Sequence, residues 1–253
     1  MRLKNEKQLE ALRQSGSRLA QVMKLMSESV APGISTGELD ELAEAKIRQL
    51  GGIPIFKGYG ASHGTPFPAS ICTSLNEEVV HGIPRRDRII KEGDLVKIDM
   101  GLRFDGMVSD MARTFAVGTV SKDAQKILDV TRESLERGIG RLKIGACISD
   151  YAAAVQGYAE SNGCSVVREL VGHGVGFELH EDPYIPNYVS RKMDDMLFRE
   201  GMAVALEPMI NLGKHHVKIG KDGWTFVTSD ASLSAHFEDT VIFSKDGVEI
   251  VTR

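Results

Sequence analysis

The sequence has 253 residues, enough for one large domain or two small ones. Hydrophobic residues make up 42% and charged residues 26%, with no apolar run near membrane-spanning length, so the composition indicates a soluble globular protein rather than a membrane protein. The formal net charge of −4, without a basic cluster, gives no electrostatic reason to expect nucleic acid as a partner. Three scattered cysteines argue against a disulfide framework and against zinc knuckles. Residues 1–14 lack the apolar core of a secretion signal, so we expect a cytoplasmic protein.

The first part of the chain predicts two helices. Apolar residues recur at helical spacing over residues 6–30. A second helix is predicted over residues 35–50, where Ser35 and Glu38 have the spacing of a capping box. A loop rich in Gly, Pro and Ser then covers residues 56–70 and leads into short strand-like runs.

The segment Phe104-Asp105-Gly106-Met107 joins two apolar-rich runs and predicts a β-hairpin, because a type I′ turn needs positive φ at both central residues. In that register Asp99 faces Ala112 and Gly101 faces Asp110. Asp99 and Asp110 then lie on one face of the sheet as diagonal neighbours. Two buried like charges are costly unless a cation lies between them, and a divalent metal would serve. The alternative is that both are surface residues of the hairpin.

The second half of the chain repeats this order of elements. Residues 123–141 predict a long helix, and a second helix follows, with Ser149 as its N-cap and Gly163 at its end. The runs "EGMAVALEPMI" and "SLSAHFEDTVIF" then predict strands that carry Glu207 and Glu238.

The acids therefore recur at corresponding places. Asp99 and Glu207 are 108 residues apart, and Asp110 and Glu238 are 128 residues apart. A repeat of this length indicates a duplicated half-domain, and the two halves must bury their acid-bearing sheets against each other. We expect an α+β fold with antiparallel sheets inside, helices outside and four carboxylates in one central cleft. It would form a single domain, residues 1–253, with halves of about 1–118 and 119–253.

Two histidines in "GHGVGFELHE" complete the candidate site. His173 lies between glycines that allow a tight bend, and His180 follows seven residues later. Carboxylate oxygens with one imidazole suit Mn, Fe, Co or Zn. Five such ligands with bridging carboxylates fit a pair of divalent ions, which lowers the pKa of a bridging water.

These residues resemble the five-ligand site of the pita-bread metallopeptidases, and most closely that of the type I methionine aminopeptidases. The resemblance covers nearly the whole chain, from about residue 5 onward, and is carried by five segments: "NEEVVHGIP", "KIDMGLRFDGMVSDMARTF", "GHGVGFELHEDP", "LEPMI" and "KDGWTFVTSDASLSAHFEDT". Type I is favoured because no insertion of about sixty residues separates His180 from Glu207.

The resemblance implies roles for individual residues. Two divalent ions would be held by Asp99, Asp110, His173, Glu207 and Glu238. Glu207 would also carry the proton of the bridging water. His81 would contact the substrate near the scissile bond, and His180 would stabilise the negative charge that develops on the scissile carbonyl.

The resemblance also places the pocket for the substrate side chain. Its walls would be Phe67, Cys72, Leu179 and Trp224. The loop before Cys72 is about five residues longer than in short bacterial enzymes of the family. The resemblance therefore gives no role to residues 60–66, which include His63, or to Tyr59 before them. His236 is interpreted as a strand residue near the site rather than a ligand, and His215 and His216 as part of a solvated turn.

The function that the resemblance implies is removal of the initiator methionine from new polypeptides with a small second residue, through attack of a metal-activated hydroxide on the first peptide bond. Nascent chain N-termini would be the partners, with at most transient ribosome contact, and the enzyme would be a monomer. An Xaa-Pro aminopeptidase or prolidase is the alternative enzyme, but those carry an extra N-terminal domain and fewer than a hundred residues precede Asp99 here. A non-catalytic pita-bread binding protein is a further alternative, although such relatives lack several ligands.

Overall fold

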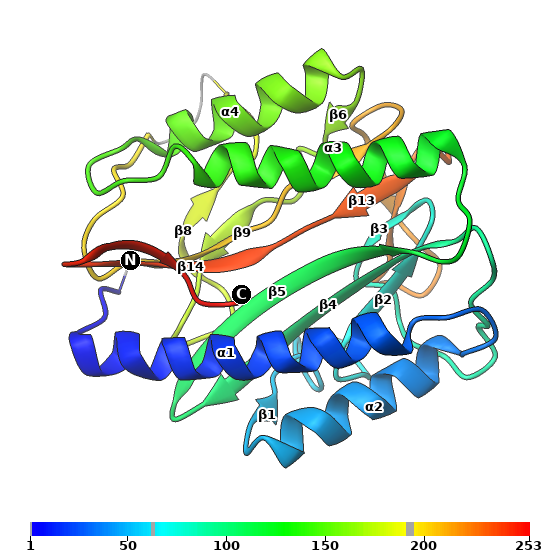
Figure 1. Cartoon of the computed structure of the whole chain (residues 1–253), viewed down its shortest axis with the longest axis horizontal. Helices are drawn as coiled ribbons and strands as arrows, with labels where there is room; N and C mark the ends of the chain where they lie inside the picture. Colours follow the sequence, from blue (N-terminus) through cyan, green and yellow to red (C-terminus); the bar gives the residue numbers. More distant parts are fainter. Residues whose placement is uncertain (1, 62–63, 191–194) are drawn as a thin grey trace.

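The computed structural model describes residues 2–61, 64–190 and 195–253. In this part of the chain, four helices lie on the outside and antiparallel strands lie between them (Figure 1). Two helices cover one side of the strands and two cover the other. The helices are α1 (Glu6–Ser29), α2 (Thr36–Gln49), α3 (Lys122–Ile139) and α4 (Ile148–Ser161).

The first half packs α1 and α2 against a sheet with the order β1-β4-β2, in which β5 also pairs with β4. The strands are β1 (Ile53–Pro54), β2 (Cys72–Leu75), β4 (Leu95–Phe104) and β5 (Met107–Ala116). The capping box of α2 is confirmed, since Ser35 N donates to Glu38 Oε2 at 2.8 Å and Glu38 N donates to Ser35 Oγ at 3.2 Å. Apolar side chains from α1, α2 and β4 fill the space between helices and sheet.

The predicted hairpin is confirmed residue by residue. Phe104 pairs with Met107, and Asp105 and Gly106 have φ values of 48° and 77°, as a type I′ turn requires. Asp99 faces Ala112 and Gly101 faces Asp110. Local turn chemistry and strand alternation therefore place both aspartates on one face of the β4–β5 pair.

The second half packs α3 and α4 over a sheet of five strands in the order β15-β14-β9-β7-β8. The strands are β7 (Gly172–Gly174), β8 (Glu181–Ile185), β9 (Ala203–Leu206), β14 (Asp239–Ser244) and β15 (Gly247–Ile250). The predicted N-cap of α4 was wrong. Cys147 is the N-cap, and its N–H donates to Asp150 Oδ2. Ser149 lies inside the helix, where its own N–H and hydroxyl donate to the carboxylate of Asp195.

Two three-stranded sheets complete the fold, with the orders β13-β10-β6 and β11-β12-β3. Their strands are β3 (Glu78–Val80), β6 (Ser165–Val166), β10 (Met209–Asn211), β11 (Val217–Ile219), β12 (Phe226–Thr228) and β13 (Ser234–His236). Because β3 belongs to the first half and β12 to the second, this pairing brings segments about 150 residues apart side by side.

Other contacts join the halves next to the aspartates. Ala112 and Glu238 form an antiparallel β-bridge, and the backbone N–H of Asp110 donates to Thr240 Oγ1 at 2.9 Å. The buried ammonium group of Lys97 donates to the carbonyls of Asn76 and Ser234. The β4–β5 hairpin is thus held in register with β13 and β14. Among the described residues, none of the helices combines the length and the apolarity that a membrane span requires.

Candidate metal centre and substrate pocket

The four predicted carboxylates converge from four strands of the two halves. Asp99 and Asp110 lie on β4 and β5, Glu207 directly follows β9, and Glu238 directly precedes β14. The exposed fractions of Asp99, Asp110 and Glu238 are 8%, 3% and 2%. Apolar strands therefore hold a group of acids away from water, which is costly without compensating positive charge.

His173, on β7, lies against these acids. Its Nε2 atom is 3.3 Å from Glu207 Oε1 and 4.0 Å from Asp110 Oδ2. Its Nδ1 atom lies 3.0 Å from the carbonyl oxygen of Gly174. Because a carbonyl oxygen only accepts, Nδ1 carries the hydrogen and Nε2 presents its lone pair to the carboxylates. This is the tautomer that a metal-binding histidine needs.

The donor set fits divalent cations. Asp110, His173 and Glu238 each offer an atom within 4.8 Å of the others. Three buried oxygens, Asp99 Oδ1, Asp110 Oδ1 and Glu238 Oε1, have no hydrogen-bond partner in the described part of the chain. Unpaired buried acceptors of this kind are rare unless an ion or a water satisfies them. All five residues predicted as ligands line one cavity.

Without a bound metal ion, the pKa values of the four acids are strongly shifted. Burial, and then repulsion from neighbouring carboxylates, raises the pKa of Asp99, Asp110 and Glu238 well above the usual range. Burial raises the pKa of Glu207 to about 8. In this environment the carboxylates are more stable with protons or a metal ion bound than as free anions.

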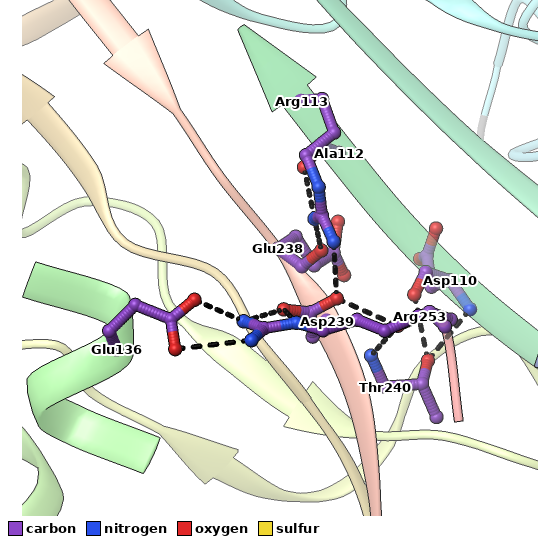
Figure 2. Close-up of polar contacts among 9 residues, drawn as sticks. Asp110, Ala112, Arg113, Glu136, Glu238, Asp239, Thr240 and Arg253 are labelled. Atoms are coloured by element: carbon purple, nitrogen blue, oxygen red, sulfur yellow. Dashed lines mark hydrogen bonds and ion pairs between the residues drawn. The ribbon is translucent and has the colours of Figure 1, made fainter. Parts of the chain in front are cut away.

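A layer of polar contacts supports the cluster from behind (Figure 2). Asp239, which is fully buried, accepts from Arg113 Nη2 at 2.6 Å and from Arg253 Nη2 at 2.7 Å. Arg113 also donates to the backbone carbonyl of Glu238. These bonds hold the chain at Glu238 and Asp239 in place behind the acids.

One cavity of about 300 Å³ adjoins the acid cluster. It is lined by every residue predicted for catalysis, metal binding or the pocket wall: Phe67, Cys72, His81, Asp99, Asp110, His173, Leu179, His180, Glu207, Trp224 and Glu238. Trp224 meets Phe67 edge to face, with ring centroids 5.3 Å apart. A Cβ built on Gly60 would lie 3.1 Å from Trp224, so the segment with the extra residues borders this wall. The cavity is apolar on one side and acidic on the other.

His81 and His180 also line the cavity. Burial and the neighbouring histidine lower the pKa of His81 to about 4 and that of His180 to about 3. Both rings are therefore neutral at physiological pH and act through a single N–H. The ring of His180 meets that of His173 edge to face at 4.3 Å, which places it beside the acids without making it part of the cluster of ligand atoms.

The structure adds site residues for which sequence reasoning gave no role. Tyr59 lines the cavity, and its hydroxyl lies 2.5 Å from His180 Nδ1. Leu170, Val171, Tyr184 and Met209 also line it. The Tyr59 contact carries no local signal, because it joins residues 121 positions apart. His63 lies outside the described residues, and His216 is exposed, with Nδ1 3.6 Å from Glu169 Oε1.

Comparison with known proteins identifies the class that this fold and site define. Residues 10–245 match the model of metallopeptidase family M24, and the chain belongs to this family. An Xaa-Pro dipeptidase from Bacillus anthracis has the same fold, with a TM-score of 0.77, 22% identity, and coverage of 99% of this chain and 62% of that chain.

The similarity to methionine aminopeptidases is much closer. The chain is 44% identical to a methionine aminopeptidase from Clostridium acetobutylicum over 250 residues, which is 99% of this chain and 98% of that protein. The crystal structure of a methionine aminopeptidase from Thermotoga maritima superposes with a TM-score of 0.94 at 38% identity, covering 100% of this chain and 99% of that one. Within family M24 the chain groups with these proteins, and the predicted α+β pita-bread fold is confirmed.

Proposed function

We propose that this protein removes the N-terminal methionine from polypeptides whose second residue is small. The observation that carries the proposal is the juxtaposition of four carboxylates and His173, most of them buried, with an apolar pocket walled by Trp224 and Phe67. The names of the close relatives support the same reaction. A pocket beside the cluster would hold the first side chain while the first peptide bond lies over the acids.

The cation site would be formed by the five converging residues: Asp99, Asp110, His173, Glu207 and Glu238. When bound, divalent cations supply Lewis-acid chemistry and lower the pKa of coordinated water. The identity of the ions is not specified by the ligands, because oxygen donors with one imidazole accept Mn, Fe, Co or Zn.

The protein's own groups would handle protons and charge. Glu207, which lines the cavity beside the proposed cation site, can accept a proton at a carboxylate oxygen and release it to the leaving amine. His180 can donate one N–H to the oxygen of the scissile carbonyl as negative charge develops there. His81, whose carbonyl accepts a hydrogen bond from Thr225 Oγ1, also lines the cavity and can contact the substrate there.

Side-chain selectivity would come from the apolar wall. Trp224, Phe67, Cys72 and Leu179 surround a narrow space suited to an unbranched, polarizable thioether. A missing or added methylene in such a pocket changes binding by about 1–3 kcal/mol, so norleucine peptides should be cleaved weakly.

A peptide panel tests this proposal. After metal removal and add-back, Met-Gly and Met-Ala peptides should lose methionine, while Met-Lys, Leu-Gly and Ala-Pro peptides should persist. Cleavage of Ala-Pro in preference to Met-Ala would assign the chain to the Xaa-Pro enzymes. No cleavage of any peptide by the folded, metal-loaded protein would favour a binding protein.

The same proposal implies partners and a compartment. New polypeptide N-termini would be the substrates, met close to the ribosome in the cytoplasm. We propose that the enzyme acts as a monomer.

A further inference from the structure

Glu207 lies between two imidazole rings, one beside each of its carboxylate oxygens. His173 Nε2 is 3.3 Å from Oε1, and His236 Nε2 is 3.7 Å from Oε2. The same His236 nitrogen is 3.9 Å from Glu238 Oε2. His236 therefore faces one oxygen of each of two proposed ligands from a single nitrogen.

The two histidines present different groups to Glu207. His173 donates from Nδ1 to the Gly174 carbonyl, so its Nε2 carries a lone pair, as a metal ligand requires. His236 is only 1% exposed, and neither of its ring nitrogens has a hydrogen-bond partner among the described residues. Two carboxylate oxygens lie within 4 Å of its Nε2, and such oxygens accept hydrogen bonds when ionised. This environment favours the tautomer with the hydrogen on Nε2.

The ring of His236 is held in place by its backbone and lies behind the carboxylates. The backbone N–H of His236 donates to Thr114 Oγ1 at 2.9 Å, and Thr114 Oγ1 donates to the backbone carbonyl of His236 at 2.7 Å. Across β10 and β13 it pairs with Met209. The cavity is lined by Glu207 and Glu238 but not by His236. An incoming ion or substrate would therefore meet the carboxylates before it met this imidazole.

We propose that His236 is a positioning residue whose Nε2–H orients Glu207 and Glu238, so that their remaining oxygens face the cations. The proposal rests on the assignment of both acids as ligands in the proposed function. The present separations exceed the length of a hydrogen bond, and an approach of about 0.7 Å to either oxygen would form one. Residues behind a metal ligand commonly act in this way.

A positioning role and a purely structural role for His236 predict different effects of its substitution. A buried imidazole without hydrogen bonds does less for folding than an apolar side chain of similar volume in the same space. His236→Leu should therefore leave the thermal stability of the metal-free protein unchanged or higher. The same variant should bind Co²⁺ or Mn²⁺ about 10–100-fold more weakly in calorimetric titrations. A side chain that served the fold alone would lower stability and leave metal affinity unchanged.

Two further variants sharpen the test. His236→Gln retains an N–H donor and should restore Co²⁺ affinity to within about tenfold of wild type. Phe237→Leu changes the next residue, which lies between β13 and β14 and packs in the α3–α4 core, and should lower stability without weakening Co²⁺ binding. If His236→Leu does not fold, His236→Met supplies the variant without an N–H.

The Co²⁺ absorption spectrum separates positioning from direct ligation. At saturating Co²⁺, His236→Leu should keep the wild-type stoichiometry and visible bands, since no ligand is lost. Wild-type Co²⁺ affinity in His236→Leu, or a lost ion with altered bands that His236→Gln does not restore, would overturn the proposal. Because these measurements need no peptide, failure of the peptide panel would leave them interpretable.

Discussion

The hydroxyl of Tyr59 lies 2.5 Å from His180 Nδ1, with the two rings edge to face at 5.1 Å. A neutral imidazole nitrogen without hydrogen is a good acceptor for a phenol. If Tyr59 donates, the hydrogen of His180 must sit on Nε2, the nitrogen available to the scissile carbonyl. Tyr59 directly precedes the segment with the extra residues, so this loop is tied to the proposed oxyanion donor.

Replacing Tyr59 by Phe should therefore slow turnover without changing the pocket much. Loss of the bond frees the His180 ring to adopt the other tautomer, and we expect kcat for Met-Ala peptides to fall by about tenfold. KM and metal content should stay near wild type. Tyr184→Phe, which removes the hydroxyl of another cavity-lining tyrosine, is the control. A fall in both variants would indicate a general effect on the pocket.

Replacing His180 should lower turnover more than replacing Tyr59. His180→Ala should lower kcat by about 10²–10³-fold, which is the usual effect of removing one oxyanion donor. Elemental analysis should show unchanged metal content, because His180 is not placed among the ligands. Loss of an ion in this variant would make His180 a ligand, and His215→Ala serves as a control outside the cavity.

Asp110→Asn tests the cation cluster. The amide offers one weaker donor oxygen in place of a carboxylate, so metal occupancy and turnover should fall together. Asp105→Asn changes the exposed turn of the same hairpin, where Asn suits the positive φ of 48°, and should leave both unchanged. Full metal content and full turnover in Asp110→Asn would refute the assignment of Asp110 as a ligand.

The metal-free protein should lose stability as pH rises. The folded-state pKa of Glu207 is raised from 4.5 to about 8, so the folded state binds more protons than the unfolded chain across this range. The free energy of unfolding that Glu207 contributes is then fully present below pH 4.5 and is lost as pH rises through about 8. The pKa values of Asp99, Asp110 and Glu238 are raised as well, so these residues act in the same direction.

Glu207→Gln isolates this effect. The variant should show a shallower fall in melting temperature across the same pH range when metal is absent. In the wild-type protein, stabilisation by added Co²⁺ should grow with pH, because the ion competes with protons for the same oxygens. Parallel pH profiles for the two metal-free proteins would show that Glu207 titrates as in the unfolded chain.

The sequence predicted the elements whose causes are local. The turn at Asp105-Gly106 and strand alternation set the register that aligns Asp99 with Ala112, and the capping box at Ser35 follows from spacing alone. The N-cap of α4 was misplaced: the cap is Cys147, whose N–H donates to Asp150, whereas the hydroxyl of Ser149 donates to Asp195 from a distant loop. Local patterns carry no record of such a contact.

The sequence by itself was enough to predict the five candidate ligands. The hairpin signal placed two of them on one face, and the family resemblance implied the roles of all five. Only the tertiary structure decided that Tyr59 contacts His180 and that His236 lies between Glu207 and Glu238. The reason is physical. Strand period and turn type depend on neighbouring residues, whereas the tautomer and orientation of a buried imidazole depend on atoms from distant parts of the chain that tertiary packing brings within 4 Å.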